Sequence, residues 1–278
     1  MGILFGLTAA LGWGLADFMV TSVARRIGVT QAMFYLQLVG LLTIGAVLLR
    51  WPDLPAPTPT MWVVTIGISL INLAGTLLLY RSFAIGTLAI VSPIASGFAV
   101  VTALLALLGG ERPAPIAIVG ALLLIGGVAV VSRSHHAGAG ARLAGVPEAI
   151  GVVICFGFYF WSLDLVRPAL GAFWPVAVTR AVEMVGALLL LLRRGAPPAR
   201  LPRSLWPTIL VAALLDTLAF VAFNLGAGTT YTSIVTALAS LFSAVTVLMA
   251  WAILRERLSR AQWAGVAVIL CGVLLVSL

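Results

Sequence analysis

The sequence predicts an all-α integral membrane protein with ten transmembrane helices, arranged as two inverted five-helix repeats. The first observation is composition: 62% of the residues are hydrophobic, only 9% are charged, and the mean hydropathy is +1.19. Soluble domains carry about 25% charged residues, so that class is excluded. The second observation is an internal repeat with an offset of 145 residues. Because each copy holds an odd number of spans, the second copy enters the bilayer from the opposite side, as in many secondary transporters.

Ten apolar stretches supply the predicted helices, since a spanning helix needs about 20 mainly apolar residues. They are 3–24, 30–50, 61–81, 88–109, 114–132, 147–166, 173–194, 205–226, 231–253 and 260–278. Nothing remains for a soluble domain. The first stretch is too long and too glycine-rich for a cleaved signal peptide. In the fourth stretch, Ser92-Pro93 predicts a kink.

Identical residues 145 positions apart define the repeats. The matched pairs are Gly6 and Gly151, Gly12 and Gly157, Glu111-Arg112 and Glu256-Arg257, Gly120 and Gly265, and Gly127 and Gly272. They predict a first repeat over residues 1–132, a cytoplasmic linker over 133–146 and a second repeat over 147–278. The linker contains adjacent His135 and His136 without further ligands at metal spacing, so we expect a solvated pair. We expect no metal and no cofactor, and no disulfide between Cys155 and Cys271.

All 16 basic residues are arginine, and their distribution predicts the orientation. Twelve fall in loops on one side of the predicted helices, three fall on the other side, and Arg180 lies within a span. Arginine-rich short loops stay in the cytoplasm. We therefore expect a multi-pass protein of the cell's inner (plasma) membrane with both termini outside. The net charge of +8 is explained by this topology signal, so no nucleic-acid partner is expected.

The Glu-Arg pairs carry a family resemblance. Glu256-Arg257 is followed by Gln262-Trp263 and Gly265 at the start of the last helix, and Gly110-Glu111-Arg112 repeats part of this pattern. With Gly12-Trp13-Gly14 in the first helix, the chain resembles the ten-helix EamA-type members of the drug/metabolite transporter superfamily. The resemblance implies transport of small metabolites by alternating access, with the pathway between two bundles. It does not imply one substrate.

Four ionisable residues lie inside predicted spans: Asp17, Arg180, Glu183 and Asp216. Each costs about 2.5–3.5 kcal/mol at the bilayer centre, so each should face a wet cavity or a partner. Arg180 and Glu183 are three residues apart and can pair, either as a structural ion pair or as an anion-binding group beside a gate or proton carrier. Asp216 is the best candidate for proton coupling, although Arg180 could simply neutralise it.

Trp13 and Asp17 are four residues apart and share a helix face, which makes a cradle for a cation. Further predicted substrate-binding residues are Asn72, Tyr159, Arg180 and Asn224, and Asp216 and Glu183 are the predicted coupling or gating residues. Asn72 belongs to a polar stripe with Ser69 and Thr76. Such stripes also serve as contacts between helices in lipid, and that alternative stays open.

We therefore expect the first four and the sixth to ninth helices to surround a cavity. The fifth and tenth should pack outside, as scaffold or as an oligomer contact in a monomer or homodimer. The predicted function is secondary transport, as an exporter, of small metabolites such as amino acids or organic cations, in a lipid bilayer. Proton coupling and gradient-independent exchange both remain open. A membrane enzyme is disfavoured because clustered His, Asp or Cys residues near one interface are absent from the sequence, and a non-transport role gains nothing from duplication.

Overall fold

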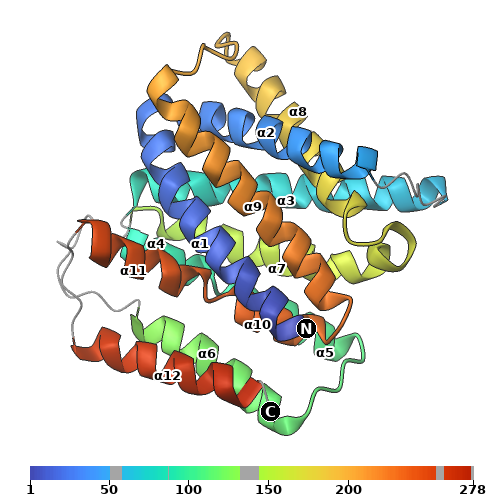
Figure 1. The fold of residues 1–278 in the computed structure, drawn as a ribbon, viewed down its shortest axis with the longest axis vertical. Helices are drawn as coiled ribbons and strands as arrows, with labels where there is room; N and C mark the ends of the chain where they lie inside the picture. The colour runs from blue at the N-terminus through green and yellow to red at the C-terminus, as the bar shows by residue number, and fades with distance from the viewer. Residues whose placement is uncertain (51–57, 87, 132–143, 255–259, 277–278) are drawn as a thin grey trace.

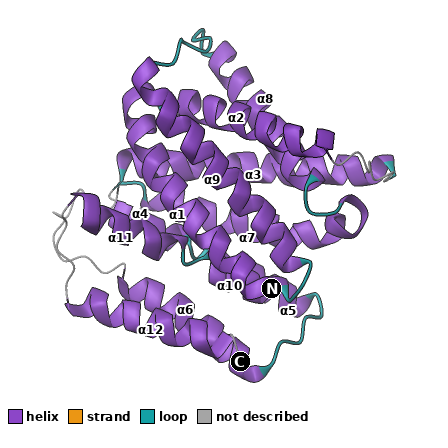
Figure 2. Cartoon of the chain, in the orientation of Figure 1, coloured by secondary structure: helices purple, strands orange, loops and turns teal. Residues whose placement is uncertain are grey.

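The computed structural model describes residues 1–50, 58–86, 88–131, 144–254 and 260–276. Within these residues it contains helices and no strand, as Figure 2 shows. The helices are α1 (Gly2–Ile27), α2 (Val29–Arg50), α3 (Pro59–Ile85), α4 (Leu88–Ala95), α5 (Phe98–Leu108), α6 (Pro115–Val131), α7 (Val146–Leu170), α8 (Trp174–Arg193), α9 (Trp206–Ala227), α10 (Thr232–Ala239), α11 (Phe242–Leu254) and α12 (Arg260–Val276), with a 3₁₀ turn at Arg203–Leu205. The predicted linker lies largely outside the described residues.

Among the described residues, six helices are long and apolar enough to cross a membrane: α1, α2, α3, α7, α8 and α9 with its preceding turn. The remaining helices are shorter. These features make the chain a multi-pass membrane protein. Three expectations stay predictions: the count of ten spans, the opposite orientation of the two repeats, and the side of the membrane on which the termini lie.

The fourth and ninth predicted stretches are each broken into two helices. α4 and α5 meet at Ser96-Gly97, and α10 and α11 meet at Ser240-Leu241, which is the equivalent place in the second repeat. The kink expected at Ser92-Pro93 stays a prediction; α4 continues as a helix through both residues and ends at Ala95. The Gly97 amide bonds to the Ile94 carbonyl at 2.9 Å. This three-residue turn replaces the four-residue helical bond, so the helix ends there.

α1 is the central helix of the bundle (Figure 1). It packs along α9 and also contacts α10, α11 and α2, while α3 packs on α7 and α2 on α8. α6 and α12 pack against each other and form one edge of the molecule, at the bottom of Figure 1. These two are the fifth and tenth predicted stretches, and they lie at the periphery as expected. Their role as an oligomer contact stays a prediction.

Glycine allows the close approach of α1 to its neighbours. A Cβ atom at Gly12 would come within 2.8 Å of the Leu215 carbonyl oxygen on α9, and one at Gly14 within 2.7 Å of the Phe242 carbonyl oxygen on α11. Such distances are too short for any side chain, so the backbones of three helices meet at these positions.

Candidate functional site

A small cavity of about 40 Å³ lies between the helices of the bundle. Its lining comes from eight helices, which belong to the first four and the sixth to ninth predicted stretches. The lining residues are Trp13, Asp17, Gln37, Thr76, Leu79, Tyr80, Phe98, Phe156, Phe160, Arg180, Glu183, Asp216, Phe220 and Phe242. The set combines aromatic rings with three acidic side chains and one arginine.

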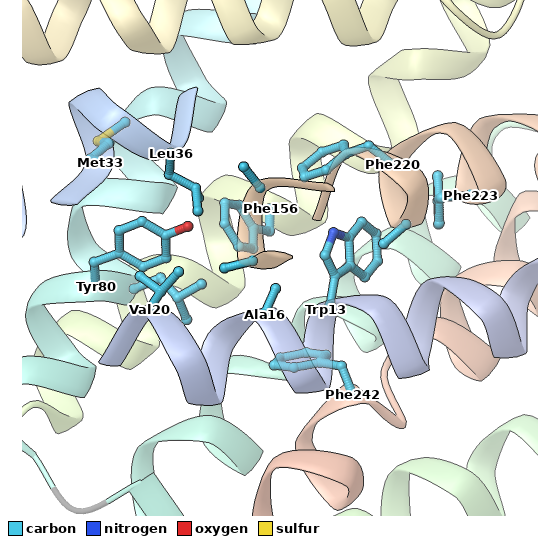
Figure 3. Packing of buried hydrophobic residues seen from close by; sticks show 14 of the residues in the cluster. Trp13, Ala16, Val20, Met33, Leu36, Tyr80, Phe156, Phe220, Phe223 and Phe242 are labelled. Atoms are coloured by element: carbon cyan, nitrogen blue, oxygen red, sulfur yellow. The ribbon is translucent and has the colours of Figure 1, made fainter. Parts of the chain in front are cut away.

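Aromatic rings form most of the wall. The Trp13 ring centroid lies 5.2 Å from that of Phe160 and 5.1 Å from that of Phe220, and Figure 3 shows Trp13 of α1 beside Phe220 and Phe223 of α9. Phe98 and Phe242 are the first residues of α5 and α11, and their rings stack with centroids 6.2 Å apart. Each helix break is therefore followed by a phenylalanine whose ring lines the cavity.

Arg180 on α8 is 1% exposed, and its Nη1 holds two partners. It donates to Asp216 Oδ2 at 2.6 Å and to Gln37 Oε1 at 2.7 Å, and the guanidinium lies 4.6 Å from the Phe220 ring centroid. Its Nε and Nη2 have no hydrogen-bond partner among the described residues. A Cβ atom at Gly40 would lie 3.2 Å from Nε, so the glycine of α2 leaves room for the guanidinium.

Glu183 is held mainly by neutral groups. Its Oε1 accepts hydrogen bonds from Asn72 Nδ2 at 2.9 Å and from Thr76 Oγ1 at 2.5 Å. Its Oε2 lies 4.0 Å from Arg180 Nη1, at the limit of an ion pair. The pairing of Arg180 with Glu183 that the spacing predicts is thus the weaker contact, because Asp216 competes at 2.6 Å.

Among the described residues, Asp17 is the acidic side chain of the lining that lacks a partner. The residue is 6% exposed, and its carboxylate forms no hydrogen bond or ion pair with the described residues. Trp13, one turn earlier, lines the same cavity, so the predicted shared face exists. With three carboxylates facing one guanidinium, the lining carries an excess of negative charge when all four groups are ionised.

The family is decided by a match to both halves of the chain. The profile of the EamA-like transporter family matches residues 1–133 and again residues 143–278. The chain belongs to the EamA-like transporter family. Membership makes it a membrane transporter of small molecules, and the family's members are transporters and not enzymes. The two matches also give a two-repeat architecture.

A solved crystal structure, described only as that of a protein, is similar over 99% of this chain and 95% of its own. The TM-score is 0.77 at 19% sequence identity, which shows a shared fold and nothing more. A search of curated proteins finds no significant match.

Three predicted substrate-binding residues of this EamA-like transporter lie behind the lining. Asn72 is bonded to Glu183, and the buried Tyr159 hydroxyl lies 3.0 Å from Thr179 Oγ1. Asn224 donates to the Phe220 carbonyl oxygen at 3.1 Å, and its own Oδ1 is without a partner among the described residues. Asn72 and Asn224 therefore bond to lining residues and Tyr159 bonds to Thr179 behind them, whereas Trp13, Asp17, Arg180, Glu183 and Asp216 lie on the cavity itself.

Sequence reasoning missed the rings of Phe98, Phe156 and Phe242 as parts of the site. An isolated phenylalanine in an apolar stretch cannot be told from a lipid-facing or core residue. The polar stripe of α3 makes contacts between helices, which is the alternative that the sequence left open: Ser69 bonds to Thr179, and Asn72 and Thr76 bond to Glu183. In the part of the chain that the structure describes, no group of three or more His, Cys, Asp or Glu residues could hold a metal.

Proposed function

We propose that this chain is a secondary transporter that exports small cationic or zwitterionic metabolites, such as amino acids or organic cations. The substrate occupies the central cavity, and the two inverted repeats expose it to each side of the membrane in turn. One observation carries the proposal. The cavity lies between eight helices, has aromatic walls, and contains a buried carboxylate, Asp17, that no described residue neutralises.

Asp17 and Trp13 are proposed to receive the cationic group of the substrate. A carboxylate without a partner in the bilayer is costly, and a bound cation removes that cost. The aromatic faces around it add attraction for an ammonium group, especially where water is excluded. Trp13 contacts Phe160 and Phe220, so the ring is held in place before the substrate arrives.

Arg180 offers a second anchor in the same cavity. Its Nε and Nη2 are buried donors that lack partners among the described residues, and a guanidinium binds carboxylates with two parallel hydrogen bonds. A substrate with both an ammonium and a carboxylate can satisfy Asp17 and Arg180 together. Amino acids have this chemistry, whereas a simple organic cation uses Asp17 alone.

Proton coupling is proposed to act through the position of Arg180. The guanidinium lies 2.6 Å from Asp216 and 4.0 Å from Glu183, so it is shared unequally between two acids. Protonation of Asp216 removes the stronger attraction and favours a shift of Arg180 toward Glu183. Such a shift alters the cavity where the substrate binds, which links proton and substrate.

Gradient-independent exchange is the second candidate. It is favoured by the contacts of Glu183, whose two hydrogen bonds from Asn72 and Thr76 are those of a structural group. In that case Asp216 and Glu183 hold Arg180 in place and do not exchange protons during transport.

The test is counterflow in proteoliposomes with a pool of labelled amino acids and organic cations. Asp17→Asn keeps the size of the side chain and removes its charge, and we expect exchange of cationic substrates to fall about tenfold or more, since hydrogen bonds to charged groups contribute about 1.5–3 kcal/mol. Glu148→Gln is the matched control, because this carboxylate pairs with the exposed Arg81 away from the cavity. Equal exchange in wild type and Asp17→Asn contradicts the binding site, and no exchange of any solute in wild type contradicts the function.

A further inference from the structure

The Gly110-Glu111-Arg112 motif of the first repeat lies outside the cavity, at the far end of α5. The Glu111 carboxylate accepts three hydrogen bonds from the start of α10: from the Thr232 amide at 2.8 Å, the Ser233 amide at 3.2 Å and Ser233 Oγ at 2.5 Å. The first amides of a helix have no partner within it, and the helix dipole favours a negative charge there. Glu111 therefore caps a helix that is 121 residues away in the chain.

The residues on either side of Glu111 hold it in this position. Gly110 has φ of +107°, a conformation that favours glycine and turns the chain at the end of α5. The Arg112 guanidinium donates to the carbonyl oxygens of Leu107 at 3.1 Å and of Glu111 at 2.9 Å, which ties the turn to the last residues of α5. Each member of the motif thus contributes to one capping contact.

A second carboxylate also bonds to the start of α10. Asp164 on α7 accepts a hydrogen bond from Thr232 Oγ1 at 2.7 Å and pairs with Arg167 at 2.5 Å. Arg167 also donates to the carbonyl oxygen of Ala227, the last residue of α9, at 2.9 Å. The ends of α5, α7, α9 and α10 are therefore joined through polar contacts, and we name this place the Glu111 end of the molecule.

α5 and α10 connect the Glu111 end to the cavity. α5 begins at Phe98 in the cavity and runs to the Glu111 turn, while α10 begins at the capped end and is followed by the break and Phe242. The two helices pack against each other beside the N-terminus, as Figure 1 shows, and every residue of α10 is buried. Phe98, the first residue of α5, stacks on Phe242, the first residue of α11, which follows α10 after the break.

We propose that α5 and α10 close the transport pathway at the Glu111 end, and that Glu111 is the positioning residue that latches them. Release of the carboxylate from the α10 amides frees the start of α10, and the attached Phe242 then withdraws from Phe98. The inference rests on the proposed transport through the cavity. It assigns to the Glu-Arg motif a role in access to the cavity and none in substrate binding.

The test measures access to the cavity from each face. Cys155 and Cys271 are replaced by alanine, and Leu79→Cys places a reporter thiol in the lining. A membrane-impermeant thiol reagent is added outside, or trapped inside, uniformly oriented proteoliposomes. For Glu111→Ala we expect the labelling rate from the Glu111 face to rise about fivefold or more, and the rate from the opposite face to fall, because the population shifts toward the state open at the Glu111 end.

Two further variants distinguish loss of the Glu111 latch from a general loss of protein stability. Ser233→Ala removes one of the three contacts and should shift labelling in the same direction by a smaller factor, with the melting temperature in detergent close to that of the parent protein. Glu148→Ala, the same substitution in the first turn of α7, should leave both rates unchanged. Unchanged rates in both latch variants, or equal rises from the two faces, overturn the latch. Labelling of the parent protein from neither face overturns the proposed function, which distinguishes the two failures.

Discussion

Loss of the Arg180 charge should strongly destabilise the fold, and the size of the effect follows from its contacts. Arg180→Leu leaves Asp216 without its partner at 2.6 Å in a site where the residue is only 7% exposed. Removal of one member of a buried ion pair costs about 3–5 kcal/mol. An unpaired charge at the bilayer centre costs about 2.5–3.5 kcal/mol, which is consistent with that range. We expect the free energy of unfolding to fall by about 3–5 kcal/mol.

A double-mutant cycle isolates the pair. Arg180→Leu combined with Asp216→Leu removes both charges and adds apolar contacts next to Phe220, so it should be at least about 2 kcal/mol more stable than Arg180→Leu alone. The free energies are measured by reversible denaturant unfolding in detergent micelles, with helix content as the signal. A loss below about 1 kcal/mol for Arg180→Leu, or single effects that simply add, would refute the ion pair as the main support of Arg180.

Three further outcomes follow from the packing. Gly14→Val should lower the free energy of unfolding by about 1–3 kcal/mol, because the added atoms meet the backbone of α11. Gly45 has open space around it, so Gly45→Ala should not lower the free energy of unfolding. Both variants are measured by the same unfolding assay. Thr76→Val should cost about 1–3 kcal/mol, since it removes a donor from a buried carboxylate; an unchanged unfolding curve would contradict that contact. Arg81→Gln should change stability by less than about 1 kcal/mol, because its ion pair is exposed; a larger loss would show a role that the geometry does not explain.

Much of the fold could be predicted because a bilayer restricts which backbone structures can cross it. Backbone groups in lipid must bond within their own helix, so apolar stretches translate directly into helices, and the match extends to most of the ten expected stretches. The breaks at Ser96-Gly97 and Ser240-Leu241 were not predicted. Neither contains proline, and a broken helix in the interior depends on packing around it that no local pattern encodes.

The ionisable part of the site could also be predicted, since charges are too costly in lipid to lie anywhere but a cavity or a pair. Asp17, Arg180, Glu183 and Asp216 all line the cavity. The choice between two partners for Arg180 could not be made from the sequence: spacing along α8 suggested Glu183, neutralisation of Asp216 was the alternative, and the approach of α9 brings Asp216 closer. That choice depends on how helices cross, which a sequence repeat does not specify.

Solute flux driven by a pH gradient tests the central claim most directly, because it asks whether the cavity moves substrate across a membrane. Proteoliposomes containing wild type or Asp216→Asn are loaded with the metabolite pool, and flux is followed with and without an imposed gradient. The account predicts flux in wild type that the gradient accelerates, and flux in Asp216→Asn that no longer responds to it. Flux that ignores both the gradient and the substitution would contradict the coupling by Asp216, and the absence of flux for every solute in wild type would contradict transport through this cavity.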